Sequence, residues 1–156
     1  MDVVERVRSI CLTFPEVTER LSHGAPTWFV RDKKVFVTCW SEGHHDDEFP
    51  HLWCAAEPGV QERLIDDDPK TFFRPPYVGH RGWVGVRLDR KPDWNQVADL
   101  CEDAYRAVAP ARLAALLDDQ PDAASGRSGA MGGASSAARK KASSARRGRS
   151  ARNILP

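Results

Sequence analysis

The sequence predicts an α+β fold: an antiparallel sheet with N-terminal and C-terminal helices on one face and two protruding hairpins. Two runs rich in β-branched and aromatic residues, 27–40 and 76–88, are each interrupted by a turn, which is typical of hairpins. Apolar residues at helical spacing occupy residues 3–14 and 94–117. Strands framed by helices at both ends indicate an antiparallel sheet with the helices packed on one face.

The longer helices follow from apolar spacing and from capping residues. Residues 3–14 carry apolar side chains at helical spacing, and Pro15 ends that pattern. Asp93 is typical of a helix cap, with Gln96 in the reciprocal position of a capping box. The buried stripe of the helix that follows is expected to be Trp94, Val97, Ala98, Cys101, Ala104, Tyr105 and Val108.

Two shorter helices are predicted from proline positions. One opens at Pro58 and Gly59 and stops before Pro69, which cannot continue a helix. The other begins at Pro110, which is tolerated at a first helical position. Its apolar residues are Leu113, Leu116 and Leu117.

The strands are predicted as two hairpins and one further strand. In the first hairpin, Asp32 and Lys33 form the turn between residues 27–31 and 34–40, and a third strand is predicted at residues 51–56. In the second hairpin, residues 76–78 and 83–88 flank a turn at residues 79–82. The expected alternation places Val84, Val86 and Leu88 on one face and Trp83 and Arg87 on the other.

Composition indicates a soluble, cytoplasmic protein that binds no membrane. No apolar run approaches the roughly 18 residues that span a bilayer, and the charged first residues lack the apolar core of a signal peptide. The four cysteines occur singly, without a CxxC motif and among apolar neighbours. This usage is typical of a reducing compartment.

Charge divides the chain into two parts. Residues 1–120 carry 15 Lys and Arg against 21 Asp and Glu, a net charge of −6, and residues 121–156 carry 8 against 1, a net charge of +7. The second part is rich in Ala, Gly and Ser and is predicted to be a disordered basic tail following a folded domain at residues 1–120. Its expected phosphate contacts are Arg139, Lys140, Lys141, Arg146, Arg147, Arg149 and Arg152.

Three separated motifs occur in order within about residues 1–117. They are SHGAPTWF at residues 22–29, YVGHRGWV at residues 77–84, and Trp94 followed by Val97 and Leu100. With these motifs the chain resembles the MmcQ/YjbR family. The resemblance implies a fold similar to the CyaY-like fold, in which two hairpins, described as a double wing, are proposed to bind DNA.

Carried over to this chain, the wings are the hairpins around Asp32 and around residues 79–82. The candidate contacts with nucleic acid are Arg31, Lys33, Lys34, His80, Arg81 and Arg87, with Trp83 as a stacking surface. The predicted function is therefore non-enzymatic, weakly sequence-selective binding of DNA, with RNA as a second partner, through the wings and the tail.

Three alternatives use other residues. A small aromatic or anionic ligand would bind the concave sheet face between the hairpins, with Arg81 and Trp83 at its edge. A metal site would draw on Cys39, His44, His45, Asp46, Asp47, Glu48, His51 and Cys54, but their spacing fits no zinc motif, and we predict no metal and no cofactor. Catalysis would need a nucleophile or an orienting partner beside His23, Trp28, Trp53, Tyr77, His80 or Arg81, and the sequence has no such motif.

Overall fold

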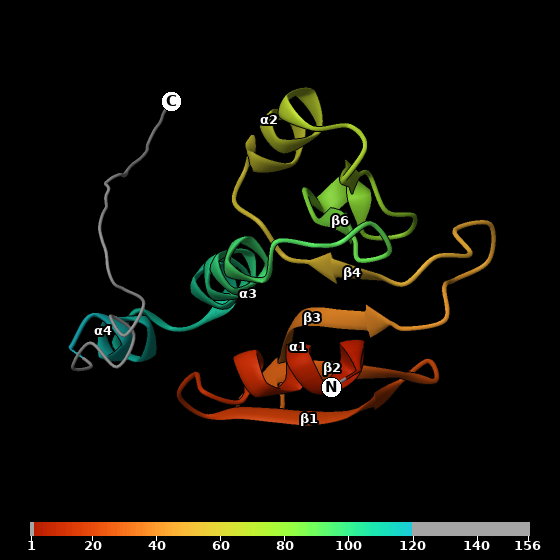
Figure 1. Ribbon diagram of the computed structural model, residues 1–156. Coiled ribbons are helices and arrows are strands. Elements are labelled where there is room, and N and C mark those ends of the chain that lie inside the picture. The colour runs from red at the N-terminus through yellow and green to blue at the C-terminus, as the bar shows by residue number, and fades with distance from the viewer. Residues whose placement is uncertain (1, 120–156) are drawn as a thin grey trace. The chain divides into compact units, whose positions relative to one another are not determined.

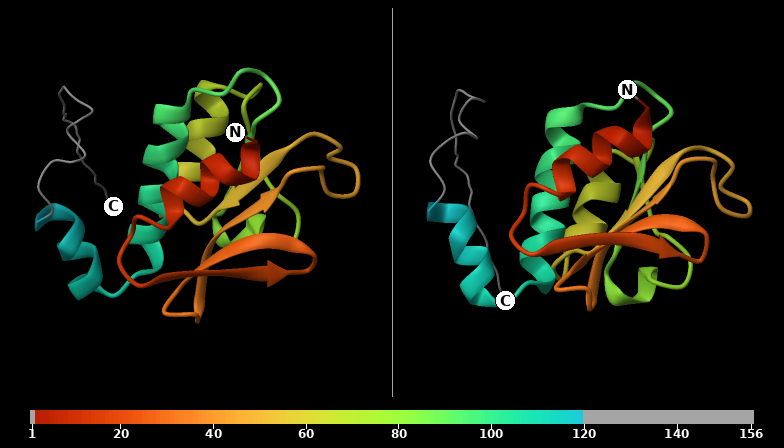
Figure 2. Two further views of the ribbon diagram at one scale, coloured as in Figure 1. Left: turned by 60° about the horizontal axis from the view of Figure 1, so that its bottom comes forward. Right: turned by 90° about the horizontal axis from the view of Figure 1, so that it is seen from below.

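The computed structural model describes residues 2–119, so the tail predicted for residues 121–156 lies outside the described residues. Six strands form one sheet in the order β1-β2-β3-β4-β6-β5, and each neighbouring pair is antiparallel (Figure 1). Helices α1 (Val3–Cys11) and α3 (Trp94–Val108) pack together over one face of the sheet (Figure 2). The predicted α+β class is thereby confirmed.

The first strand, β1 (Val17–Ser22), is absent from the sequence prediction. It pairs with β2 (Ala25–Val30) from Val17 opposite Val30 to Ser22 opposite Ala25. The two residues between these strands, His23 and Gly24, both have positive φ, 53° and 80°, as tight hairpin turns of the primed type require. The edge of the sheet is therefore a hairpin.

The predicted first hairpin is confirmed, with its turn one residue earlier. β2 pairs with β3 (Lys34–Trp40), and the Lys33 amide donates to the Val30 carbonyl at 3.0 Å. Arg31 and Asp32 occupy the centre of this turn with φ of 54° and 60°. The predicted third strand is β4 (His51–Cys54), which lies beside β3.

The second hairpin has other boundaries than predicted. β6 (Val84–Arg87) pairs with β5 (Phe72–Phe73), not with residues 76–78. Pro75 and Pro76 interrupt the ladder because proline has no backbone N–H to donate. Residues 74–83 instead form a connection that includes the 3₁₀ helix η1 (Gly79–Arg81).

Gln61 of α2 (Val60–Asp67) holds this connection in place. Its side chain is 3% exposed, and Nε2 donates to the carbonyl oxygens of Gly79 at 2.9 Å and of Trp83 at 2.5 Å. One amide side chain thus bonds to two backbone acceptors, one at the first residue of η1 and one at Trp83, shortly after η1 ends. The start of β6 is fixed to α2 by this pair of hydrogen bonds.

The C-terminal helices match the predicted caps. The Asp93 carboxylate accepts hydrogen bonds from the amides of Asn95 and Gln96 at 3.0 and 3.3 Å, which confirms the cap of α3. A last helix, α4 (Ala111–Asp119), follows Pro110 and buries Leu113. The compact unit that includes the sheet extends to Leu117. Within residues 2–119, no helix is long and apolar enough to cross a membrane.

All four cysteines are buried, and we expect them to be unreactive in the folded protein. Cys11, Cys39 and Cys101 are 0% exposed and Cys54 is 1% exposed. Burial raises the pKa of the Cys11 thiol and raises the pKa of Cys39 to about 12, which suppresses the reactive thiolate. An aromatic disulfide reagent should label the thiols only at the rate of unfolding, and all four at once in concentrated urea. Immediate labelling of a native thiol contradicts this expectation.

Candidate functional site

A cluster of aromatic side chains covers the sheet face opposite α1 and α3. On β3 and β4, Cys39 and Cys54 point toward α3, where Cys54 contacts Cys101. Strand alternation therefore turns Trp40 and Trp53 to the other face. We define the aromatic face as Trp40, His44, Phe49, His51, Trp53, Phe73 and Tyr77, whose contacting rings have centroids 4.4 to 6.3 Å apart.

Four buried nitrogen atoms of the aromatic face have no hydrogen-bond partner. They are Nε1 of Trp40, Nδ1 of His44, Nε2 of His51 and Nε1 of Trp53. Within residues 2–119, every buried side-chain nitrogen or oxygen without a partner belongs to this cluster. An unpartnered buried polar group costs about 1–3 kcal/mol. Buried polar groups in folded proteins normally have a partner, so four unpartnered nitrogens in one cluster distinguish this part of the described domain.

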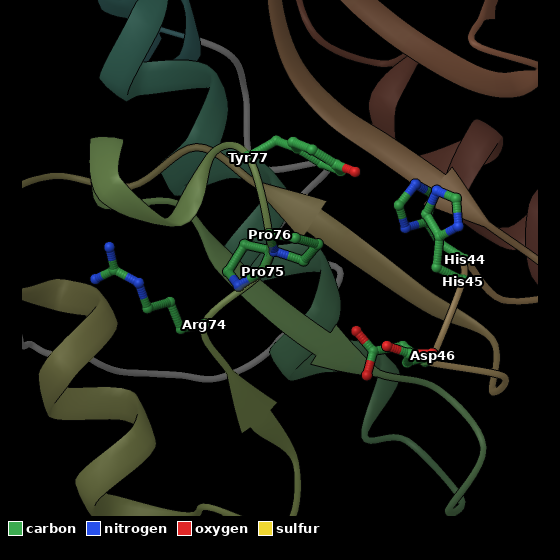
Figure 3. A pocket seen from close by; sticks show the side chains of 8 residues that line it. His44, His45, Asp46, Arg74, Pro75, Pro76 and Tyr77 are labelled. Carbon is green, nitrogen blue, oxygen red and sulfur yellow. The ribbon is translucent and has the colours of Figure 1, made fainter.

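A cleft of about 600 Å³ adjoins the aromatic face (Figure 3). The loop after β3 and the connection after β5 line it with His44, His45, Asp46, Asp47, Arg74, Pro75, Pro76 and Tyr77. The Tyr77 side chain extends toward the two histidines, and Arg74 lies at the opposite end (Figure 3). The His44 ring is 6.0 Å from the Tyr77 ring and 4.4 Å from the Trp40 ring. His44 therefore connects the cleft to the aromatic face.

A tight turn fixes the histidine side of the cleft. The His44 amide donates to the Asp47 carbonyl at 2.9 Å, and the Asp47 amide donates to the His44 carbonyl at 3.0 Å. Gly43 precedes this turn with φ of 89°, and a Cβ there would lie 2.7 Å from the Asp47 carbonyl oxygen. Glycine is required at this position because of both the backbone conformation and the close approach. The cleft wall is therefore preformed.

Backbone strain marks the other side of the cleft. Tyr77 has φ of 64°, and the Val78 amide donates to the Pro76 carbonyl at 2.6 Å, which encloses Tyr77 in a three-residue turn. A bulky residue in this conformation costs on the order of 1–3 kcal/mol. The turn holds the Tyr77 ring 71% exposed at the edge of the cleft. Strained turns of this kind cluster at ligand sites.

His51 lies at the base of the aromatic face and is 0% exposed. Its Nδ1 is 2.7 Å from the Phe49 carbonyl oxygen, so in the neutral ring Nδ1–H donates to that carbonyl and Nε2 is an acceptor. Burial lowers the pKa of His51, although the Phe49 carbonyl and the Asp47 carboxylate act in the opposite direction. Burial also lowers the pKa of His44.

Acidification from about pH 7 to about pH 5 should lower the free energy of unfolding. The unfolded chain takes up a proton on His51 near the usual pKa of about 6.5, whereas the folded chain takes it up only at lower pH. This stability is fully present above the unfolded pKa and is lost as the pH falls through the folded pKa. Denaturant unfolding at a series of pH values measures the effect, and His51→Phe should flatten it.

The Glu19 carboxyl group provides a second, separate pH window for comparison. The hydrogen bond from Arg8 lowers the pKa of Glu19, so its contribution is present above about pH 4.3 and is lost below it. His51→Phe should leave that lower window unchanged. If the variant keeps the full loss of stability between about pH 7 and pH 5, the assignment to His51 is wrong.

The structure pairs two of the predicted wing arginines with carboxylates. Arg31 Nε lies 2.8 Å from Glu16 Oε1. Arg87 donates to Asp89 through Nε at 3.0 Å and through Nη2 at 2.7 Å, and its guanidinium lies over the Phe49 ring. Their charges are thus locally compensated, which makes both weaker candidates for phosphate contact.

The other predicted wing residues divide by exposure. Lys33 and Lys34 are exposed at the first turn, and His80 and Arg81 are exposed on η1. Trp83 is 4% exposed and packs in the core, with the Arg81 guanidinium 5.5 Å from its ring centroid. The prediction of Trp83 as a stacking surface is therefore wrong. The tail contacts predicted between Arg139 and Arg152 lie outside the described residues.

The candidate metal ligands named in the sequence analysis do not lie together, because they occupy both faces of the sheet. Cys39 and Cys54 belong to the core beneath the helices, whereas His44 and His51 lie on the aromatic face. Within residues 2–119, no three His, Cys, Asp or Glu side chains are arranged to hold a metal ion.

These features define an α+β domain with a preformed cleft on its open sheet face. A family model described as YjbR matches residues 12–107, more than half of the chain, and the protein belongs to the YjbR family. Its fold is similar to the crystal structure of DR2400 from Deinococcus radiodurans, a protein with a DUF419 domain: the TM-score is 0.59 at 18% identity, covering 78% of this chain and 91% of that one. No curated protein matches this chain.

Proposed function

We propose that the protein is a non-enzymatic binding domain that takes up a small planar ligand in the cleft between residues 44–47 and 74–77. The observation that carries this proposal is a cleft whose wall includes one member of the cluster of four unpartnered buried nitrogens. His44 contributes one of these nitrogens and also lines the cleft. A ligand that hydrogen-bonds to His44 would remove the free-energy cost of leaving its Nδ1 unpaired.

The size and lining of the cleft support the same proposal. Small-molecule sites usually have volumes of about 300–1,000 Å³, with apolar walls and a few placed polar groups. This cleft, at about 600 Å³, combines the Tyr77 ring and two prolines with histidine, aspartate and arginine side chains. Aromatic rings on two sides favour a flat ligand, because rings prefer offset stacking or edge-to-face contact.

Nitrogen-15 NMR of the indole N–H groups tests this function directly. A library of planar compounds is titrated into the full chain, and a bound ligand should shift the signals of Trp40 and Trp53. Trp28 is an internal reference because its Nε1 already donates to Glu19 at 3.0 Å in the core. Trp94, which lies under the Arg6 guanidinium, is a second reference.

A matched pair of variants distinguishes loss of binding at the cleft from the general effect of removing an exposed apolar side chain. Tyr77→Ala removes a 71% exposed ring from the cleft and should weaken ligand binding at least about tenfold, equivalent to losing about 1.4 kcal/mol. Leu12→Ala removes a 47% exposed side chain at the end of α1 and should leave binding unchanged. If no planar compound shifts Trp40 or Trp53 at millimolar concentration, the cleft is not a ligand site.

Nucleic-acid binding is the second candidate function, favoured by the division of charge. The segment after residue 120 contains eight Lys and Arg residues and one acidic residue. Clustered cations neutralise phosphates without needing a fold and carry little sequence information. On the described domain, the exposed cations Lys33, Lys34 and Arg81 support a smaller contribution from the wings.

A further inference from the structure

One of the four unpartnered nitrogens belongs to a residue of the cleft wall. It is Nδ1 of His44, since Trp40, His51 and Trp53 do not line the cleft. A neutral imidazole nitrogen donates or accepts one hydrogen bond, so a ligand in the cleft can pair with His44 through a polar ring atom. The His44 ring lies 4.4 Å from the Trp40 ring and 5.0 Å from the Trp53 ring, so we expect a ligand against His44 to change the surroundings of both indoles.

Charge at the cleft selects against anions. Asp46 and Asp47 line it on the histidine side, and Arg74 lies at the opposite end (Figure 3). A carboxylate or phosphate on the histidine side would therefore face two like charges, whereas an amino group would find acceptors there. Tyr77, 71% exposed, provides a ring against which a flat neutral molecule can stack.

We propose that the cleft binds a neutral, planar nitrogen heterocycle with an exocyclic amino group, a ligand of the nucleobase type. The ring stacks against Tyr77, the amino group donates to the carboxylates of Asp46 and Asp47, and a polar ring atom pairs with Nδ1 of His44. This inference rests on the proposed function and adds the chemical class of the ligand.

The experiment compares five probes on the full chain by the same indole NMR titration. Adenine and cytosine carry the amino group, purine lacks it, and benzoate and phenyl phosphate are planar anions. We expect adenine to bind at least about tenfold more tightly than purine, because only adenine carries the amino group that donates to the Asp46 and Asp47 carboxylates. The two anions should leave Trp40 and Trp53 unshifted.

Charge-neutral variants test the role of the aspartates. The double variant Asp46→Asn, Asp47→Asn should reduce the preference for adenine over purine to within about threefold. Glu48→Gln removes a negative charge from the same loop without lining the cleft, and should keep the full preference. An equal loss of preference in both variants overturns the assigned role of the aspartates.

The outcomes distinguish this inference from the function on which it rests. If benzoate or phenyl phosphate shifts Trp40 and Trp53 more strongly than adenine does, the ligand class is wrong and the cleft remains a ligand site. If these probes leave both indoles unshifted while another planar compound of the library shifts them, the ligand class is wrong; if the whole library leaves them unshifted, the proposed function itself fails.

Discussion

Replacing Gln61 with leucine should lower the free energy of unfolding by about 1–3 kcal/mol. The variant keeps nearly the same side-chain volume but removes the donor that reaches the carbonyl oxygens of Gly79 and Trp83. The Gly79 carbonyl still accepts from the Gly82 amide at 3.0 Å, whereas the buried Trp83 carbonyl loses the donor that Gln61 supplies, and an unsatisfied acceptor costs about 1–3 kcal/mol. Denaturant unfolding followed by tryptophan fluorescence measures the loss.

The neighbouring residue provides the control. Glu62 lies next to Gln61 on α2 and is exposed, so Glu62→Gln should change stability by less than about 0.5 kcal/mol. In Gln61→Leu, the indole N–H signal of Trp83 should shift, because the connection that Gln61 holds ends at Trp83. A Gln61→Leu protein as stable as the control means that the 79–83 connection is held by other contacts.

The sequence predicted those elements whose local pattern agrees with their tertiary environment. The α3 helix has both an amphipathic stripe and a capping aspartate, Asp93, and its start matches the prediction. β1 was missed because its central residues are polar. It is held by a tertiary network in which Glu19 accepts hydrogen bonds from Arg8 of α1 and from the indole of Trp28 on β2. No local pattern along β1 encodes those partners.

The predicted alternation along β6 is correct for Val84 and Val86, which face the helices, and for Arg87, which faces the other way. The expectation that this other face is exposed is wrong, because the Phe73 ring packs directly on Gly85 where a side chain would otherwise project. Trp83, expected to offer a stacking surface there, is only 4% exposed. A glycine within a predicted strand often marks such a close approach, so Gly85 was the available signal.

The candidate cleft was only partly visible in the sequence. His44, His45, Asp46 and Asp47 were recognised as chemically active residue types, and Tyr77 as a possible pocket residue. These side chains line one cleft because of the turn that Gly43 permits and the strained backbone conformation at Tyr77. Both are backbone conformations imposed by tertiary contacts, which side-chain periodicity does not report.

Neutralising the basic tail should produce the largest change in nucleic-acid affinity. Each Lys or Arg that contacts a phosphate releases counterions, so log affinity falls with log salt with a slope of about −0.9 per contact on duplex DNA. If about half of the eight cations after residue 120 engage at once, changing all eight to glutamine should reduce the magnitude of the slope by about 3.6. Titrations of duplex, single-stranded DNA and RNA at several salt concentrations measure it.

Single variants on the domain set the scale for this change. Arg81→Ala should reduce the slope by at most about 0.9, since it removes one exposed cation. Arg87→Ala should have less effect, because Asp89 already pairs with Arg87 at 2.7 Å and binding a phosphate would break that pair. If neutralising the tail changes neither affinity nor slope, the tail does not bind nucleic acid. A large effect of Arg81→Ala, or of replacing Lys33 and Lys34, would then assign binding to the wings despite the net charge of −6 on residues 1–120.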